Sequence, residues 1–402
     1  MSRSADYTIS GFLYQFNKTL LEILQANEDA EITVEGIIED IEVSDQDDLK
    51  AIQCKYHEGQ EQFNLSTIYK PILQMIEHHF DNNASNIEYR LFTHFPSELT
   101  GSHRTITKEE IVTILDSNNQ KLQKYTQKLK GKVDIDLFLT KFVFEFGPTL
   151  DELIDSVYTS FEQNGIAPDD IETLIYPNAI QVISELSIKH NESDRKITKK
   201  ILLQHLSKIK KTAVTRWTRA LKSFEQIVKQ RRKQLHTNLS KNSRLRYFYI
   251  NECELEDFQE CIVTFISEYI EKYHFKDLHD KTPLFLLDCS VDSYNDIRIR
   301  LYKKGIKFND GFITDQYFDK NKLFIEPIRS KIGKSVQIEF SIRLLRYNSN
   351  EDLLNENKCQ DFFLFGDKDL IDLDQRDINI EKIGLNNINQ IKFVLGMSDT
   401  YE

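Results

Sequence analysis

The apolar residues between positions 8 and 95 change from helical to strand spacing and back, and this order restricts the chain to few folds. The first run, which includes Phe12, Phe16 and Leu20, has helical spacing. Gly36 marks a bulge or turn between two short strands, and the polar residues 44–48 predict a hairpin loop. The predicted elements are, in order, a helix at 8–27, two strands within 31–43, a third strand at 49–56, a helix at 63–80 and a fourth strand at 87–95. This order predicts a small mixed sheet flanked by helices.

The rest of the chain reads as a helical region followed by a second mixed region. Residues 105–240 have mostly helical spacing, with an extended piece at 138–146 before a break and a helix capped by Thr149. After residue 243 we expect a helix near 254–273 and strands at 284–287, 323–325 and 336–344. We therefore expect an α/β chain in three parts: a mixed-sheet domain at 1–100, a helical region at 101–243, and a mixed α/β domain at 244–402 that senses a signal or docks a partner.

Composition excludes several classes of protein. The chain has 402 residues, 40% of them apolar and 11% aromatic, which favours globular packing over disorder. Its five cysteines form no Cys-x-x-Cys pair, so neither a disulfide framework nor a zinc knuckle is expected. No stretch of 18 apolar residues and no signal-peptide core occur, and we expect a soluble, cytoplasmic protein.

Two further motifs fail on spacing. Ile332-Gly333-Lys334-Ser335 resembles the end of a phosphate-binding loop, but Ile328 stands where the motif needs its first glycine. A zinc site formed by Cys253, Cys261, His274 and His279 is not expected either, because the two cysteines are too far apart for a zinc hairpin.

The third predicted strand ends in Ala51-Ile52-Gln53-Cys54-Lys55. Residues two apart in a strand share a face, so Gln53 and Lys55 point the same way while Ile52 and Cys54 face the core. A carboxamide oxygen beside an ammonium group suits a site that holds a divalent cation and contacts a phosphate. Such a cation also needs acidic ligands. Asp40 lies opposite Gln53 across the predicted hairpin, and Glu35 lies one short strand earlier.

This order of elements and residues resembles the PD-(D/E)xK, restriction-endonuclease-like superfamily, in the variant in which Gln replaces the usual acid. The helix opening Gly11-Phe12-Leu13-Tyr14-Gln15 also resembles nuclease domains of bacterial anti-phage effectors, both those of cyclic-oligonucleotide defence systems and those that partner HerA-type ATPases. The chain departs from the better-known motif in having Glu39 before Asp40 in place of Pro. The choice among Glu39, Asp40 and Glu42 as ligands therefore stays open; Asp40 and Glu42 share a strand face.

The resemblance implies an activity and a set of residue roles. Asp40, Gln53 and Glu35 would hold Mg²⁺ or Mn²⁺, Lys55 would be the catalytic lysine, and Gln15 would be a supporting polar group. The implied reaction is magnesium-dependent endonucleolytic cleavage of double-stranded DNA by a defence effector. It also implies a homo-oligomer, with a HerA-type ATPase or another defence subunit as a candidate partner. Two alternatives stay open: a catalytically degenerate DNA-binding scaffold subunit and an RNA nuclease.

Positive charge is concentrated in one segment of an acidic chain. The formal net charge is −12, yet residues 195–246 contain 17 Lys and Arg against one acid, Glu225. Acids at i,i+4 normally balance a solvated basic helix, so their near absence favours contact with the phosphate backbone. The candidate DNA-binding residues are Lys199, Lys200, Lys210, Lys211, Arg216, Arg231, Arg232 and Lys233.

Overall fold

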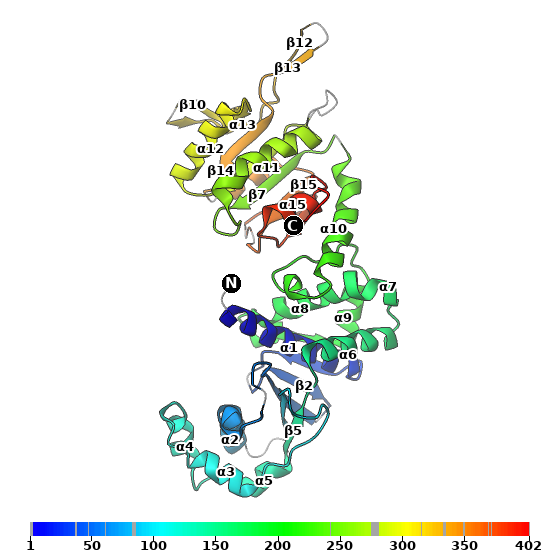
Figure 1. Ribbon diagram of the computed structural model, residues 1–402, viewed down its shortest axis with the longest axis vertical. Helices are drawn as coiled ribbons and strands as arrows, with labels where there is room; N and C mark the ends of the chain where they lie inside the picture. Colours follow the sequence, from blue (N-terminus) through cyan, green and yellow to red (C-terminus); the bar gives the residue numbers. More distant parts are fainter. Residues whose placement is uncertain are drawn as a thin grey trace. The chain divides into compact units, whose positions relative to one another are not determined.

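The chain forms two compact units, Met1–Lys210 and Lys211–Glu402, called here the first and second unit (Figure 1). The computed structural model describes residues 3–36, 38–46, 48–60, 62–82, 86–241, 243–274, 281–314, 316–332, 335–348, 350–368, 370 and 372–401. Both units are mixed α/β, as the sequence predicted. The predicted helical region 101–243 does not stand apart: residues 101–210 belong to the first unit and 211–243 to the second.

The first unit begins with the predicted helix and three strands. Its described elements are α1 (Arg3–Gln25), β1 (Glu31–Val34), β2 (Ile41–Asp45), β3 (Asp48–Tyr56), η1 (Leu65–Ile68), α2 (Tyr69–Asp81), β4 (Ile87–His94), α3 (Lys108–Leu115), η2 (Gln120–Leu122), α4 (Gln123–Leu129), α5 (Ile135–Thr140), β5 (Phe142–Phe146), α6 (Leu150–Gln163), α7 (Pro168–Asp170), η3 (Ile171–Ile175), α8 (Tyr176–Ser187), η4 (Glu192–Arg195), β6 (Lys196–Thr198) and α9 (Lys199–Leu206). The predicted order through β4 is confirmed.

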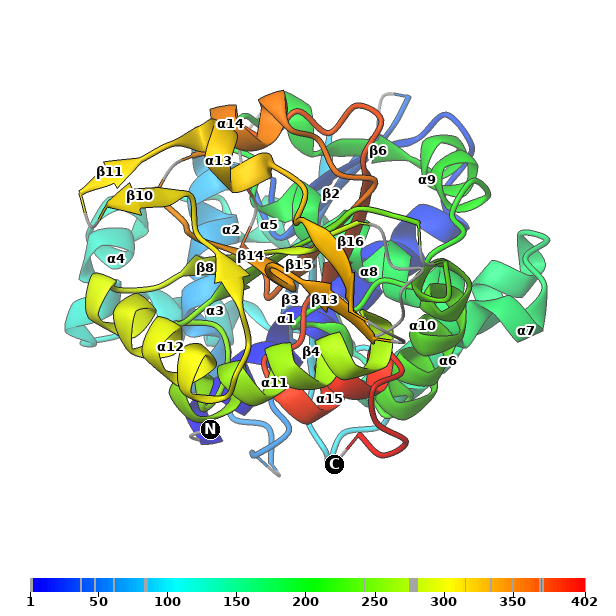
Figure 2. The same ribbon diagram turned by 90° about the horizontal axis from the view of Figure 1, so that it is seen from above.

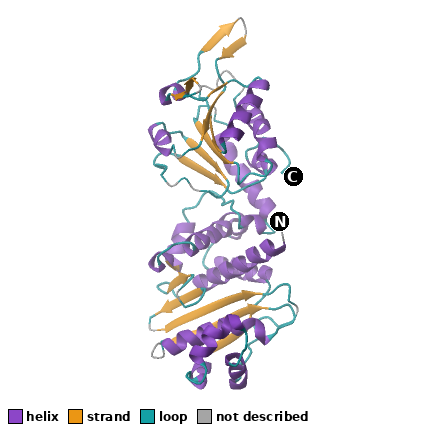
Figure 3. Cartoon of the chain, turned by 90° about the vertical axis from the view of Figure 1, so that its left-hand side faces the viewer, coloured by secondary structure: helices purple, strands orange, loops and turns teal. Residues whose placement is uncertain are grey.

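One six-stranded sheet, in the order β5-β4-β3-β2-β1-β6, runs through the first unit. β3, β4 and β5 are parallel to one another, whereas β1 pairs antiparallel with both β2 and β6. In the β2–β3 hairpin Ile41 lies opposite Ile52, a register that places the residue before β2, Asp40, beside Gln53. Helices cover both faces of this sheet (Figure 3).

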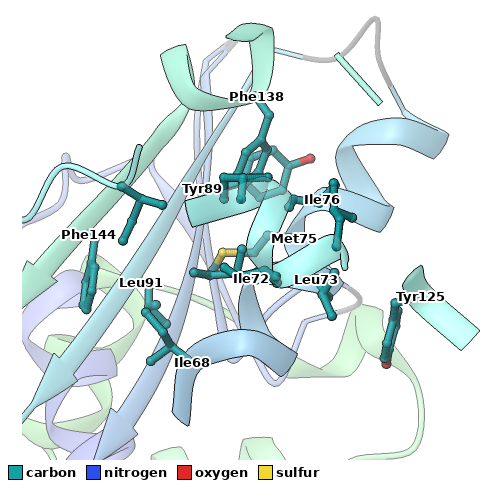
Figure 4. Packing of buried hydrophobic residues seen from close by; sticks show 14 of the residues in the cluster. Ile68, Ile72, Leu73, Met75, Ile76, Tyr89, Leu91, Tyr125, Phe138 and Phe144 are labelled. Carbon is teal, nitrogen blue, oxygen red and sulfur yellow. The ribbon is translucent and has the colours of Figure 1, made fainter. Parts of the chain in front are cut away.

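The face that carries Ala51 and Tyr89 is closed by α2 to α5. Ile72 and Met75 of α2 and Phe138 of α5 are fully buried against Tyr89 and its strand neighbours (Figure 4). Burying apolar side chains of this size contributes about 1.5–3 kcal/mol each. This cluster therefore fixes the face of β3 on which Gln53 and Lys55 lie.

The opposite face of the sheet meets α1. Tyr14 is fully buried and stacks on Tyr56 and Phe92, with ring centroids 4.7 and 5.6 Å away. Gly147, just after β5, has no room for a side chain, because a Cβ there would lie 2.2 Å from the Tyr14 hydroxyl. Thr149 then starts α6 with a capping box to Glu152, which confirms the predicted cap.

The second unit holds a sheet of a different kind. Its described elements are η5 (Thr218–Ala220), α10 (Phe224–Leu239), β7 (Arg246–Asn251), α11 (Phe258–Tyr273), β8 (Leu284–Asp288), α12 (Val291–Lys303), β9 (Phe308–Asn309), β10 (Phe312–Thr314), β11 (Tyr317–Phe318), α13 (Lys320–Phe324), β12 (Arg329–Ile332), β13 (Ser335–Ile338), β14 (Ile342–Arg346), α14 (Glu351–Glu356), β15 (Asp361–Phe365), β16 (Asn379–Ile383) and α15 (Ile388–Val394).

Six parallel strands in the order β16-β15-β7-β8-β14-β9 form the main sheet of the second unit. Phe248 lies between Phe285 and Phe363, stacked on each at 5.0 and 4.9 Å, so the strands β15, β7 and β8 share an aromatic row. Helices α11, α12 and α15 lie on one side of the sheet, and α13 and α14 on the other (Figure 2). Coverage on both faces is the usual setting of a parallel sheet.

The predicted strand 336–344 is divided between β13 and β14, and two other predicted strands were wrong in part. Residues 323 and 324 end the helix α13, which Asp319 caps by accepting a hydrogen bond from the amide of Asn321. The predicted extended piece at 138–146 begins inside α5, which Asp134 caps in the same way. In both places an acidic cap precedes the apolar run, and that signal outweighs the strand-like composition of the run.

Candidate active site

Four segments of the first unit bring the five predicted site residues to one corner of the sheet. α1 contributes Gln15, the residue after β1 is Glu35, the residue before β2 is Asp40, and β3 contributes Gln53 and Lys55. The corner between β1 and β2 is closed by a hydrogen bond of 2.8 Å from the Glu35 amide to the Asp40 carbonyl. The two acids are therefore held across a short, closed turn.

Asp40 is tied to the third strand through its carboxylate. Its Oδ2 accepts a hydrogen bond from the side-chain amide of Gln53 and another, of 2.9 Å, from the backbone amide of Cys54. Burial is the largest influence on this carboxyl and raises its pKa, while Lys55 acts in the opposite direction. β3 thus positions Asp40. The positive charge of Lys55 does not fully offset the rise in the pKa of Asp40 that burial causes.

Glu35 is held by the first helix. Gln15 Nε2 donates a hydrogen bond of 2.7 Å to its carboxylate. The backbone of Glu35 is left-handed, with φ 51°, a conformation that costs a residue with a side chain about 1–2 kcal/mol. Burial raises the pKa of Glu35 first, and nearby Asp40 raises it further. The motif residue Gln15 therefore acts at the site, whereas its neighbour Tyr14 anchors α1 in the core.

Lys55 is the cation shared by these acids. It is half-buried on β3, and its charge opposes the raised pKa values of Glu35, Glu39 and Asp40. Ile52 and Cys54 are buried, as predicted, but Gln53 is buried as well, because helices cover both faces of the sheet. The polar side chains of β3 consequently lie in a partly desolvated place, where electrostatic interactions are stronger than in water.

Glu39 also belongs to this corner. It is 7% exposed, and its Oε1 has no hydrogen-bond partner among the described residues. Burial raises its pKa to about 8, and the charge of Asp40 adds to the rise. Glu42 takes a different role, because its Oε1 accepts a hydrogen bond of 2.6 Å from the amide of Ile38 and fills the space beneath Gly36.

The buried acid Glu39 predicts a pH dependence of stability. The folded chain keeps this proton at pH values at which the unfolded chain, with an ordinary pKa of 4.5, has released it. The free energy of unfolding therefore falls as the pH rises from about 4.5 towards 8. Glu39→Gln removes this fall in the free energy of unfolding, because the amide of Gln does not titrate. In urea unfolding with EDTA, followed by circular dichroism, the stability gained by the variant should be larger at about pH 8 than at about pH 5. The prediction is contradicted if the free energy of unfolding depends on pH in the same way in the variant and in the unchanged chain.

The donor set of the corner suits a hard divalent cation. Glu35 and Asp40 offer carboxylate oxygens and Gln53 a carbonyl oxygen, the ligand type that Mg²⁺ prefers. Burial raises the pKa values of all three acids of the corner, and Lys55 opposes the rise in each case. Among the described residues, no three His, Cys, Asp or Glu side chains form a complete metal cluster. Gln53 and water would have to complete the coordination of Asp40 and Glu35.

The candidate DNA-binding residues are divided between the two units. Lys199, Lys200 and Lys210 lie in the first unit, and the others in the second. Lys200, Lys210, Arg216 and Lys233 are exposed, and the Arg216 guanidinium lies over the ring of Trp217. The candidate residues therefore belong to two compact units.

Three of these cations pair with acids of the second unit, and one of them is not at the surface. Lys211 lies 3.0 Å from Glu381, and Arg232 lies 2.9 Å from Asp399. Arg231 is 2% exposed and forms an ion pair with Glu381, itself 1% exposed. The expectation that Arg231 contacts DNA is therefore wrong. Its charge belongs to the interior of the second unit.

The rejected motifs lie partly outside the described residues. His279, Gly333 and Lys334 are not among them. Cys253 is exposed and Cys261 is partly buried.

In the described ranges no helix has the length and apolar character needed to cross a membrane.

The fold and the site define an α/β chain with a cluster of acids, an amide and a lysine at one sheet corner. No family model matches the chain, and none of the curated proteins matches it either. Among solved structures it is similar to an Acinetobacter baumannii Cap4 SAVED/CARF-domain containing receptor with the cyclic trinucleotide 2'3'3'-cAAA. The identity is 14%, the TM-score is 0.30, and the match covers 88% of this chain and 90% of that one.

A second similar structure is the Moraxella osloensis Cap4 SAVED/CARF-domain containing receptor, with 12% identity, a TM-score of 0.20, and coverage of 99% of this chain and 94% of that one. Likenesses at these TM-scores assign neither an activity nor a ligand to this chain.

Proposed function

We propose that the first unit is a metal-dependent endonuclease that cleaves double-stranded DNA. The observation that carries the proposal is the convergence of Gln15, Glu35, Asp40, Gln53 and Lys55, drawn from four segments, at one partly buried corner. Perturbed pKa values that gather at one place are typical of functional sites, and burial raises the pKa values of Glu35, Glu39 and Asp40 here.

The residues have distinct roles in this proposal. Asp40, Gln53 and Glu35 would hold a magnesium or manganese ion, which lowers the pKa of water and offsets phosphate charge when it is bound. Lys55 would stabilise the negative charge that develops on the phosphate in the transition state. Gln15 orients Glu35, and the backbone amide of Cys54 orients Asp40. Exposed Lys200 and Lys210 of the same unit would contact the DNA backbone without reading sequence.

The proposed biological role is that of an effector of bacterial anti-phage defence, from the resemblance carried by Gly11–Gln15 and Gln53-Cys54-Lys55. The second unit would then sense a signal or dock a partner, such as a HerA-type ATPase. A homo-oligomer is part of the same proposal.

One set of assays tests the proposed activity. The purified chain is incubated with duplex DNA, single-stranded DNA and RNA, each with Mg²⁺, with Mn²⁺ and with EDTA. Cleavage of duplex DNA that EDTA abolishes is expected. DNA binding without cleavage under every condition would favour the scaffold alternative, and cleavage confined to RNA would favour the ribonuclease alternative.

Replacing Gln53 by Glu tests the ligand set independently of cleavage. The change removes the side-chain amide that donates to Asp40 and adds a carboxylate next to it. The free energy of unfolding without metal should therefore fall by about 1–3 kcal/mol. Millimolar Mn²⁺ should restore stability to this variant more than to the unchanged chain, because the added carboxylate is a better ligand. Thermal unfolding with Mn²⁺ and with EDTA measures both effects.

The matched control is Gln120→Glu, which adds the same charge at an exposed position of η2. It should change neither stability nor the response to Mn²⁺. If Gln53→Glu gains no more from Mn²⁺ than this control does, Gln53 is not a metal ligand.

A further inference from the structure

Arg195 reaches the corner that carries Glu35 from a distant part of the first unit. Its Nη1 donates a hydrogen bond of 2.6 Å to the backbone carbonyl of Glu35, 160 residues earlier in the chain. Its Nε donates to the carbonyl of Lys189 at 2.7 Å, and its Nη2 to that of His190 at 3.5 Å. One guanidinium thus ties the end of β1 to the segment that follows α8.

We infer that Arg195 is a positioning residue of the candidate active site: its guanidinium holds the β1–β2 corner and thereby fixes Glu35 relative to Asp40. The inference rests on the proposed function and adds to it a residue that lies outside the nuclease motif. Arg195 touches no reacting group in this role; it acts through the backbone of Glu35.

The neighbouring strand explains why Arg195 is in place. β6 pairs with β1 at the edge of the sheet, with Lys196 opposite Thr33. Arg195 is the residue just before this pairing, so the register delivers it to the end of β1, where Glu35 follows Val34. The rigid planar fork of a guanidinium suits several carbonyl oxygens at once, which an ammonium group cannot match in geometry.

The corner needs such support because of its backbone. Glu35 has a left-handed φ of 51°, and it relaxes towards an ordinary conformation unless its surroundings hold it. Three contacts hold it: its amide donates to the Asp40 carbonyl, its carboxylate accepts from Gln15, and its carbonyl accepts from Arg195. Losing the contact to Arg195 frees the carbonyl, so the Glu35 carboxylate would sample positions away from Asp40. Metal affinity would weaken before the chemistry itself changed.

The test compares Arg195→Gln and Arg195→Lys with Lys196→Gln in the full chain. Lys196 is the matched control, because it lies next to Arg195 on β6 but forms its ion pair with Glu31, 2.7 Å away, at the other end of β1. Two quantities are measured: hydrogen exchange of the peptide that contains Glu35–Asp40, without metal, and the Mn²⁺ concentration that gives half-maximal DNA cleavage. Circular dichroism checks that each variant is folded.

Arg195→Gln should speed exchange at the corner and raise the half-maximal Mn²⁺ concentration by about 10-fold or more, while saturating Mn²⁺ restores most of the cleavage rate. Arg195→Lys should give a smaller shift, and Lys196→Gln none. A half-maximal Mn²⁺ concentration unchanged in Arg195→Gln, or shifted as far in Lys196→Gln, overturns the inference and leaves the proposed nuclease intact. If the unchanged chain cleaves no nucleic acid with any metal, the proposed function fails, and the positioning role falls with it.

Discussion

Replacing Lys55 by Ala is expected to lower the rate of duplex DNA cleavage by about 100-fold or more at saturating Mg²⁺. The reason is that Lys55 is the cation on β3 whose charge reaches Glu35, Glu39 and Asp40 together, so no neighbour can replace it at a phosphate. The rate is measured on linear duplex DNA under single-turnover conditions. Binding of the same DNA with Ca²⁺ in place of Mg²⁺ should weaken far less than cleavage does, because one lysine contributes little to contacts along the phosphate backbone.

Stability separates this effect from simple unfolding. Lys55 is only half-buried, and removing it leaves the apolar cluster of α2 and β4 unchanged, so circular dichroism and thermal unfolding should stay close to those of the unchanged chain. Lys121→Ala, at an exposed position of the same unit, should cleave normally. If Lys55→Ala cuts DNA at the same rate as the control, the assignment of Lys55 as the catalytic lysine is wrong.

Replacing Arg231 by Met should lower the free energy of unfolding of the second unit by about 3 kcal/mol, because buried Glu381 then keeps only half-exposed Lys211 as a counter-charge. The single tryptophan of the chain, Trp217, is buried in this unit, so urea unfolding followed by its fluorescence measures the effect directly. DNA affinity measured well below the unfolding midpoint should not change, since the guanidinium does not reach the surface.

Its neighbour Lys233 provides the control. This residue is exposed on the same helix, and Lys233→Met should change stability by no more than about 0.5 kcal/mol. The double variant Arg231→Met, Glu381→Leu should regain part of the lost stability, because the buried carboxylate is then removed as well. A single Arg231→Met variant as stable as Lys233→Met would show that the pair is not a structural element of the interior.

The spacing of apolar residues in the sequence was sufficient to predict the part of the site that lies within one hairpin. Asp40 and Gln53 are adjacent because β2 and β3 follow each other directly, and the spacing of apolar residues determined both strands. Glu35 and Gln15 could be expected near them because β1 and α1 complete the same small motif. The predicted order of elements through β4 held for the same reason.

Contacts between distant segments could not be predicted in this way. Arg195 and Glu35 are separated by 160 residues, and β6 is three residues long, too short to show a strand pattern. The sequence predicts Arg231 as a DNA-binding residue because nothing near it in the chain indicates its partner Glu381, 150 residues later. A count of charges along the chain gives their number and sign, but it does not reveal which cation is neutralised inside a fold.

The position of β6 at the edge of the sheet has a consequence for biosynthesis. The chain carries Asp40, Gln53 and Lys55 long before the ribosome has made Arg195. At about 5–20 residues per second, the interval is on the order of 10 s. During that time the nascent chain has Asp40, Gln53 and Lys55 but neither the edge strand nor the guanidinium that contacts Glu35. In the proposed nuclease, a fragment that stopped in this interval would lack the contact that fixes Glu35, and we expect it to bind Mn²⁺ more weakly than the full chain does.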